Sequence, residues 1–434
     1  MNKFLRSFLV RGLILVLIAA AGYAILTKHV STSASGKLFV SSDVIAYVDA
    51  ARNMIEGRDI YLDEAGGRNS YVYPPFFAFM CIPLTVLPPL TVDIVWYCLN
   101  VFLILATLRL CYASATGSSF STLRSREQWL YAGLSVLLSL RYLIRNAQDA
   151  NVNMVILFLI VAGFHVSQKR GNPAWTVLIG VAAAIKILPL LFIVYFAGKR
   201  QWRELLYVAG GFAVATFLPI VAIGVGKNTE YVRMFANYTQ SQFSAQGLEI
   251  ENFSFWGTFG RLFSHQKAFD GPDGNPVFIN VASFSLAAIR VLVYCINLAL
   301  AGIVYMMGRK ERETSFDHPR NAGFFATLVA VSLSSILIED HHTVSFMVVY
   351  LFLLLSWKEH YRASKLFLSL IAGSGLLSLL LSYDLIVPVF GKYLYMILLS
   401  LSLPVLPVAI VLLGLLMYCS NASRVQAPRV SHTS

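Results

Sequence analysis

The sequence predicts an all-α protein that crosses a membrane many times. Of its 434 residues, 57% are hydrophobic and only 13% are charged, and the mean hydropathy is +0.67. A soluble globular domain carries about 25% charged residues. Apolar runs of roughly 17 to 25 residues, each long enough for one helical crossing, recur along most of the chain. These observations predict a polytopic helical membrane protein.

We expect about twelve crossings. The long apolar runs lie near 8–26, 91–113, 129–145, 151–168, 173–197, 204–226, 282–308, 321–338, 343–357, 365–383 and 393–418. A shorter run at 76–90 is interrupted by prolines and completes the count. The chain shows no tandem repeat and no low-complexity linker, so we expect one membrane domain over 1–434.

Basic loops predict the orientation of these helices. Lysine and arginine collect in short loops on the cytoplasmic side, and such loops occur at 198–204, 308–313 and 357–365 and in the tail 420–434. The first run follows basic residues but is long and lacks a convincing cleavage site, so we read it as a retained signal anchor. Both termini are then cytoplasmic, and the long loops 27–75 and 227–281 lie outside.

One region contradicts this orientation. The same count of helices places Arg124, Arg126, Lys169 and Arg170 outside, against the rule that basic loops stay inside. Short or re-entrant helices within 114–172 would shift the assignment. The sequence therefore leaves the topology of residues 114–172 open.

Charge and cysteine usage exclude other classes of protein. The formal net charge of +12 is explained by basic cytoplasmic loops, and we assign no nucleic-acid partner. The five cysteines lie within or beside apolar runs without paired spacing. They indicate neither a disulfide framework nor a zinc site.

A polar segment after the first run carries two carboxylates, Asp43 and Asp49. Apolar residues recur here every three or four positions, which predicts an amphipathic helix over 43–56 lying on the membrane surface. Ser41 and Ser42 precede it as caps, and an ionised carboxylate at the first turn is stabilised by the helix dipole. A carboxylate fixed at the lipid–water boundary is well placed to deprotonate a hydroxyl.

The two carboxylates cannot serve the same pocket equally. Asp49 lies six residues after Asp43, which is about 600° of helical rotation and therefore about 120° away. Asp43 is closer to the membrane run and is flanked by small serines, so we favour it as the reactive group. Asp49 either contacts the substrate or solvates the outer face of the helix.

The segment 70–89 contains aromatic residues beside a helix start. Tyr71 and Tyr73 form an interfacial aromatic pair, and Pro74 and Pro75 end the preceding loop before a helix begins. An ordinary aromatic belt explains this pattern as well as a binding site does. Its position shortly after the acidic helix favours the binding site.

Several separated motifs resemble one known family. The motif residues are Asp43, Gly57 and Tyr61, then Tyr73-Pro74-Pro75-Phe76, Pro83-Leu84, Leu87-Pro88, Trp96 and Asn100, then Asn146, Gln148 and Asn151 or Asn153, then Gly180, Lys186 and Pro189, and finally Asn252, Ser254 and Arg261. Their order over roughly 40–360 resembles glycosyltransferase family 87, which includes polyprenyl-phosphate-mannose-dependent mannosyltransferases. The element RNAQDANVNM departs from the family pattern, with Ala147 where glycine is usual and two extra residues before the second asparagine.

The resemblance implies a class C membrane glycosyltransferase fold and a reaction. Such enzymes transfer a sugar, here most simply mannose, from a polyprenyl phosphate to a lipid or glycan hydroxyl on the outer face, with inversion. Asp43 matches the family's catalytic base, and one base is enough, whereas glycoside hydrolases need two carboxylates. The expected partners are the lipid-linked donor, the acceptor and membrane lipids, with no cofactor. The expected location is the bacterial inner membrane.

A polar turn at 339–342 is the second candidate element. It contains Glu339, Asp340, His341 and His342 between two apolar runs. Ionisable residues in such a place are costly unless they border a water-filled cavity. The turn also resembles a histidine-containing turn of the family, so we assign both histidines to the catalytic site, as hydrogen-bonding groups for sugar or phosphate. Adjacent histidines seldom share one zinc ion, and a third ligand cluster is missing, so we expect no metal.

The leaving phosphate needs positive charge or hydrogen-bond donors. The candidates are Arg52 and Arg58 in the first outer loop, Arg261 in the second and Lys186 inside an apolar run. Lys186 has a structural alternative, because it could snorkel or pair with Asp149. Arg141 and Arg145 are further candidates for the same task. We also assign Tyr73, Gln148, Asn252 and Ser254 to substrate binding, which the family resemblance implies.

Two other classes remain open at this level. A transporter or flippase of lipid-linked sugars would show inverted halves with interrupted helices at matching positions, and the sequence shows none. A scaffold subunit of an envelope-assembly complex is the third interpretation, which the charges inside apolar runs disfavour. For the enzyme, we expect a cavity bounded by the helix 43–56, the turn 339–342 and the segment 250–261.

Overall fold

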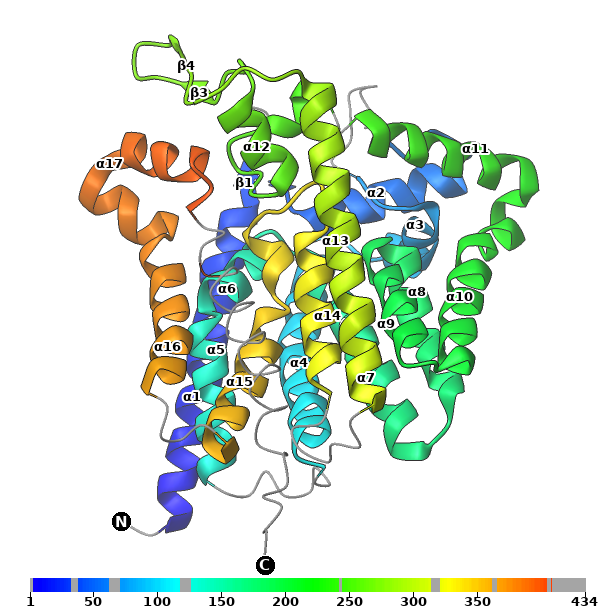
Figure 1. The fold of residues 1–434 in the computed structure, drawn as a ribbon, viewed down its shortest axis with the longest axis vertical. Coiled ribbons are helices and arrows are strands. Elements are labelled where there is room, and N and C mark those ends of the chain that lie inside the picture. Colours follow the sequence, from blue (N-terminus) through cyan, green and yellow to red (C-terminus); the bar gives the residue numbers. More distant parts are fainter. Residues whose placement is uncertain are drawn as a thin grey trace, which may run out of the picture.

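The computed structural model describes residues 3–32, 38–61, 71–117, 126–241, 244–313, 321–360, 365–403 and 407. The predicted tail 420–434, Arg124 and the end of the predicted run 393–418 lie outside these residues. The chain is mostly helical where it is described (Figure 1). The only strands in this part form two short antiparallel pairs, Val30–Thr32 with Leu38–Val40 (β1, β2) and Phe269–Asp270 with Pro276–Val277 (β3, β4). The all-α prediction is confirmed.

The helices follow the apolar runs but differ from them in detail. Their bounds are α1 Lys3–His29, α2 Asp43–Ile55, α3 Pro75–Cys81, α4 Pro89–Thr116, α5 Arg126–Leu138, α6 Leu140–Gln148, α7 Asn153–Arg170, α8 Val177–Ile185, α9 Leu191–Gly198, α10 Trp202–Phe217, α11 Ile220–Ser241, α12 Phe255–Phe263, α13 Leu286–Glu313, α14 Ala322–Leu333, α15 Phe346–His360, α16 Lys365–Leu380 and α17 Tyr383–Ser400.

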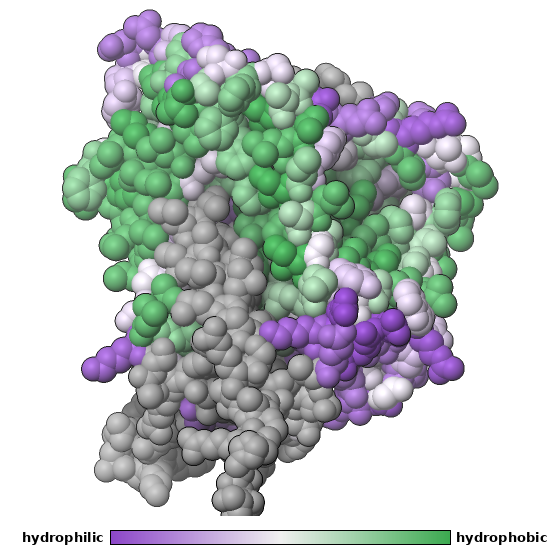
Figure 2. Space-filling model, in the orientation of Figure 1, coloured by the Kyte–Doolittle hydropathy of each residue, from purple (hydrophilic) through white to green (hydrophobic). Residues whose placement is uncertain are grey.

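One face of the molecule is apolar across its middle. Figure 2 shows hydrophobic residues across the centre of one face and hydrophilic residues at the upper end and the lower right. Among the described helices, α4 and α13 are long and apolar enough to cross a membrane alone, and the bent pairs α10–α11 and α16–α17 raise the number to four. The prediction of about twelve crossings is therefore not confirmed.

Several of the predicted crossings are not single helices. The run 76–90 forms the short helix α3 and a 3₁₀ turn, Ile82–Val86. The run 173–197 forms α8 and α9, which are separated by extended backbone at Lys186 and a 3₁₀ turn that contains Pro189. Proline lacks the backbone N–H that a continuing helix needs, so hydropathy alone overestimates both segments. The run 129–145 is also interrupted, at Ser139 between α5 and α6.

The α8–α9 segment turns back to the end of the molecule from which it starts. Where it begins, the hydroxyl of Thr176 donates to the carbonyl of Glu204 at the start of α10, 3.0 Å away. Where it ends, Lys199 forms a 3.2 Å ion pair with Glu311 near the end of α13. Because Glu204 and Lys199 flank the short α9–α10 connection, the two ends of the α8–α9 segment lie together. This segment is a helical hairpin.

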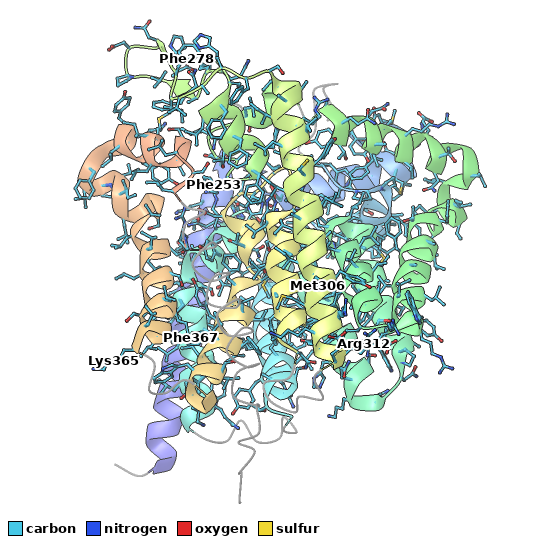
Figure 3. The ribbon with its side chains drawn as sticks, viewed as in Figure 1. Phe253, Phe278, Met306, Arg312, Lys365 and Phe367 are labelled. Atoms are coloured by element: carbon cyan, nitrogen blue, oxygen red, sulfur yellow. The ribbon has the colours of Figure 1, made fainter. Side chains whose placement is uncertain are left out.

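These two corrections remove the conflict in the basic loops. Lys169 and Arg170 end α7 immediately before the hairpin and lie at the same end as Lys199. Figure 3 labels Arg312 and Lys365 at this lower end, and Phe253 and Phe278 at the opposite end. The prediction placed Lys169 and Arg170 on the opposite side from the basic loop 198–204, because it counted 76–90 as a crossing, and the structure places both at one end.

Helix α2 begins at Asp43, as predicted, but its surroundings differ. Its apolar face is buried in the main core and packs against α3 and α4. The predicted aromatic pair is also internal, with Tyr71 and Tyr73 only 1% and 5% exposed. Their rings lie 6.4 and 5.3 Å from that of Tyr47. Helix α2 and this aromatic cluster therefore belong to the protein interior, and neither the surface helix nor the interfacial pair was predicted correctly.

Gly180 allows α8 and α10 to pack in contact. A Cβ atom at this position would lie 2.2 Å from the carbonyl oxygen of Val208. We expect Gly180→Val to destabilise the protein by about 1–3 kcal/mol through overpacking, and thermal unfolding in detergent would measure it. The control is Gly210→Ala, since Gly210 has open space around its Cβ position. An unchanged melting temperature in Gly180→Val would contradict this packing.

The course of the chain makes a labelling prediction. We expect cysteines replacing Arg170 and Arg203, both exposed, to react with an impermeant maleimide from one side of the membrane only. A cysteine replacing the exposed Asp273, in the β3–β4 turn, should react from the other side. The background is a variant with its native cysteines replaced. Labelling of the first two positions from opposite sides would show that the α8–α9 segment crosses the membrane.

Candidate active site

Asp43 is held by residues from the connection between α6 and α7. Its backbone N–H donates to the carbonyl of Asp149, 3.0 Å away. Its carboxylate Oδ2 accepts a 2.7 Å hydrogen bond from the side-chain amide of Asn151. A connection of four residues, beginning after α6 ends at Gln148, therefore fixes both the main chain and the side chain of Asp43.

The same connection reaches the histidine turn. Asn153 donates 2.7 Å to Asn151 Oδ1 and 2.9 Å to the carbonyl of His341. The Nζ of Lys186, at the break between α8 and α9, lies 3.3 Å from Asn153 Oδ1. The structure therefore brings together Asp43, the turn at 339–342 and Lys186, which are far apart in the sequence.

The electrostatic environment of Asp43 contains opposing influences. Burial raises the pKa of the Asp43 carboxyl above its ordinary value, while His341 and the hydrogen bond from Asn151 act in the opposite direction. His341 Nδ1 lies 2.9 Å from Asp149 Oδ2, at ion-pair distance but without the alignment of a hydrogen bond. Burial also raises the pKa of Glu339. A raised pKa suits Asp43 as a base, because the carboxylate must be ionised and still bind a proton readily.

His342 and Tyr73 face the same region as neutral groups. Burial, reinforced by Lys186 and His341, lowers the pKa of His342 well below its ordinary value, and its Nδ1 accepts from the N–H of Glu339 at 3.1 Å. Burial raises the pKa of Tyr73, so its hydroxyl keeps its proton at neutral pH. That hydroxyl lies 3.2 Å from Asn151 Nδ2.

A small cavity adjoins Lys186 and His342. Its volume is about 50 Å³, and Asn153 also lines its polar end. The rest of the lining is largely apolar and comes from α7, α14 and the segment after Lys186, with Ile156, Leu157, Ile160, Leu328 and Val331 among its residues. The cavity therefore joins an apolar space to a cationic group. The suggested pairing of Lys186 with Asp149 was wrong, since Asp149 forms a 3.1 Å ion pair with Arg145.

Asn252 and Ser254 attach the α12 segment to the chain before the histidine turn. Asn252 donates to the carbonyl of Ile336, 2.9 Å away, and accepts from the N–H of Ile338 at 3.0 Å. Ser254 donates to the same Ile336 carbonyl at 2.8 Å and accepts from the N–H of Gly257, as a helix cap. Both side chains therefore bond within the protein, and their predicted substrate contacts stay a prediction.

Arg261 is fully buried and binds backbone carbonyls instead of facing a ligand. Its guanidinium donates to the carbonyls of Leu248, Glu249, Asn252 and Ser400 and to the hydroxyl of Ser402, at 2.6 to 3.3 Å. These contacts use the five N–H donors of an arginine. The expected phosphate-binding role of Arg261 does not agree with this arrangement, which joins α12 to the end of α17.

The remaining predicted residues lie farther from Asp43 or contact it indirectly. Arg52 forms a 3.1 Å ion pair with Asp49, and both side chains are about one-third exposed, on another side of α2. Arg58 pairs with Glu56. Gln148 contributes its backbone carbonyl, which accepts a hydrogen bond from His29.

Three further charged residues belong to the surroundings of the site. Arg141 donates two hydrogen bonds to Asp340, at 2.8 and 2.9 Å, and so anchors the histidine turn to α6. His29 and Asp93 form a buried pair beside Ser42, and sequence reasoning missed both. The available signal was a carboxylate near the start of a largely apolar helix. Within the described ranges, no group of three or more His, Cys, Asp or Glu side chains is arranged to hold a metal ion.

Comparison with known proteins identifies the family. Residues 71–338, more than half of the chain, match the profile of glycosyltransferase family 87. The chain belongs to this family. It is also similar to two curated polyprenol-phosphate-mannose-dependent alpha-(1-2)-phosphatidylinositol mannoside mannosyltransferases. One, from Mycolicibacterium smegmatis, is 28% identical over 45% of this chain and 47% of that protein. The other, from Mycobacterium tuberculosis, is 25% identical over 41% and 44%, respectively. The matches cover about half the length of these relatives.

The contacts of Arg261 predict a loss of stability when it is replaced. Arg261→Gln leaves several buried carbonyls without a donor, and we expect a loss of at least about 2 kcal/mol, since hydrogen bonds to charged groups contribute roughly 1.5–3 kcal/mol each. Thermal unfolding in detergent is the measurement. Arg52→Gln is the control, because its ion pair is partly exposed and contributes little. A stable Arg261→Gln protein with a raised KM for the donor would instead indicate a phosphate ligand.

Proposed function

We propose that this family 87 protein is an inverting glycosyltransferase that moves mannose from a polyprenyl phosphate to a lipid or glycan hydroxyl on the outer face of the membrane. The observation that carries the proposal is the convergence on Asp43 of Asn151 and the histidine turn, beside a cavity that contains Lys186. The similarity to polyprenol-phosphate-mannose-dependent mannosyltransferases supports the choice of donor.

The chemistry is a single displacement. Asp43 accepts the proton of the acceptor hydroxyl as its oxygen attacks the anomeric carbon from the side opposite the phosphate. The bond between the anomeric carbon and the phosphate oxygen breaks, and polyprenyl phosphate leaves with the electron pair. Inversion follows because attack and departure occur on opposite faces.

The leaving group meets positive charge at Lys186. A cation held in a partly buried place stabilises negative charge as it develops on the phosphate, and the neutral His342 supplies a further polar group beside it. The apolar lining of the same cavity is compatible with the first part of an isoprenoid chain. The donor therefore enters with its sugar toward Asp43 and its lipid along α7 and α14.

The orientation follows from the basic loops. The described basic residues Lys199, Arg312 and Lys365 lie toward the end of the molecule opposite to α2 and α12 (Figures 1 and 3), and lysine and arginine collect on the cytoplasmic side. This arrangement supports an outward-facing site in a bacterial cell membrane. The two relatives are named for a phosphatidylinositol mannoside acceptor, and for this chain we propose an acceptor of the same general kind, a glycosylated lipid or glycan hydroxyl.

The direct test incubates the purified protein with a panel of polyprenyl-phosphate sugars and lipid extracts, followed by mass spectrometry. We expect release of free polyprenyl phosphate from the mannose donor. Asp43→Asn removes the proton acceptor, so turnover should fall by roughly 10²–10⁴-fold. Asp49→Asn is the matched control and should change turnover little, because Asp49 is partly exposed and pairs with Arg52.

The pH dependence gives a second measurement on the same protein. The raised pKa of Asp43 means that the ionised base is lost at a higher pH than for an ordinary aspartate, so the rate should fall as pH decreases through that pKa. A folded Asp43→Asn protein with near-normal turnover would exclude Asp43 as the base. Movement of an intact lipid-linked sugar across vesicles without phosphate release would favour the flippase.

A further inference from the structure

A buried ion pair adjoins the residues that hold Asp43. His29, the last residue of α1, is 7% exposed, and its Nδ1 lies 2.8 Å from Oδ2 of Asp93, the fifth residue of α4. Asp93 is 2% exposed. The strands β1 and β2 return the chain so that the N–H of Ser41 donates to the carbonyl of His29. The pair therefore lies next to the start of α2.

Both members of the pair bind a neighbour of the site. The hydroxyl of Ser42 donates to Asp93 Oδ1 at 2.7 Å, and Ser42 directly precedes Asp43. The Nε2 of His29 donates to the carbonyl of Gln148, which directly precedes Asp149. Asp149 in turn accepts the N–H of Asp43. The Asp43 N–H and the Asp149 carbonyl form the contact between two chain segments. The ion pair fixes each segment one residue before this contact, at Ser42 and at Gln148.

The hydrogen bonds determine where the protons lie. A bond from Nε2 to a carbonyl requires a proton on Nε2, since a carbonyl only accepts. The contact between Nδ1 and the carboxylate requires a second proton, and an imidazole binds it more strongly than a carboxylate does by more than about two pKa units. His29 is therefore an imidazolium in this geometry, and a neutral ring would lose one of the two contacts.

We propose that the His29–Asp93 ion pair positions Asp43 for proton abstraction, and that full turnover requires His29 in its charged form. This inference rests on the proposed function, in which Asp43 is the base. Neither residue touches the reacting atoms, so both are positioning residues. Loss of the second proton frees one segment beside Asp43, and a small displacement of a catalytic group lowers the rate strongly.

The charged groups around His29 define the direction of the pH effect. Asp93 faces it from α4, Asp149 faces it from the end of α6, and Tyr97 of α4 lines the small cavity beside it. The hydrogen bond to Asp93 raises the pKa of His29 above its ordinary value, burial opposes this, and the Gln148 carbonyl adds to it. A raised pKa keeps the ring charged to a higher pH, and the charge is lost as pH rises further. The rate should therefore fall at alkaline pH as well as at acid pH.

The test measures kcat and KM for the polyprenyl-phosphate mannose donor against pH, for the full-length protein in detergent or nanodiscs. We call the decrease in kcat at alkaline pH the alkaline fall. We expect His29→Gln to lower kcat by roughly 10–100-fold, to change KM little and to abolish the alkaline fall. Asp93→Asn should move the alkaline fall to lower pH, because His29 loses its carboxylate partner. His165→Gln is the control, since His165 bonds Ser114 near the opposite end of the molecule. It should keep the wild-type profile.

A purely structural role would give a different result. It would lower the yield or melting temperature without moving the alkaline fall in the protein that remains folded. If His29→Gln does not fold, Asp93→Asn and Ser42→Ala test the same inference. Ser42→Ala removes one hydroxyl and leaves the ion pair, so kcat should fall several-fold while the alkaline fall keeps its position. Wild-type kcat in Ser42→Ala together with an unmoved alkaline fall in Asp93→Asn would overturn the proposal.

Asp43→Asn separates this inference from the proposed function. If that variant keeps near-normal turnover, the proposed base is wrong whatever the His29 variants do. If Asp43→Asn is inactive while His29→Gln keeps both its kcat and its alkaline fall, the ion pair does not position the base and only the present inference fails.

Discussion

The site depends on the satisfaction of buried polar groups within an apolar helical body. The connection between α6 and α7 places Asn151 and Asn153 where both are almost fully buried, and a buried amide without partners is costly. Each amide therefore takes fixed partners: Asp43 and Tyr73 for Asn151, and the His341 carbonyl for Asn153. Because these partners come from three distant parts of the chain, the requirement for hydrogen bonding in the interior also assembles the site.

The position of Asp43 reflects a balance between burial and ionisation. Deep burial alone would keep the carboxyl protonated, and full exposure would make it a weak base with an ordinary pKa. Here burial raises the pKa while Asn151 and His341 favour the charged form. The surrounding cations and acids, including Arg145 with Asp149 and Arg141 with Asp340, form paired interactions. These ion pairs allow several charged groups to lie around Asp43 beside an apolar helical body.

Local periodicity was sufficient to predict some of this arrangement. The spacing of apolar residues gave α2 with its start at Asp43, and the angle between Asp43 and Asp49 separated a carboxylate that meets Asn151 from one that pairs with Arg52. Hydropathy failed where an apolar run contains a break. Hydropathy averaged over a stretch of residues does not detect the extended backbone at Lys186. The α8–α9 hairpin was therefore counted as one crossing. The run 76–90 forms only a short helix and a 3₁₀ turn, and removing both runs from the count of crossings leaves the orientation of every later loop unchanged.

Long-range hydrogen bonds could not be predicted at all from the sequence. Asn252, Ser254 and Arg261 resemble a family motif, and a motif does not distinguish residues that contact a ligand from residues that shape the chain. In the structure, Asn252 and Ser254 hold residues 336–338, and Arg261 holds Asn252 in turn. These residues 336–338 lead directly into the turn whose His341 carbonyl binds Asn153. In the structure the motif therefore contacts the site through the backbone, by fixing where the histidine turn begins, and the buried arginine contributes to this through its bond to the Asn252 carbonyl.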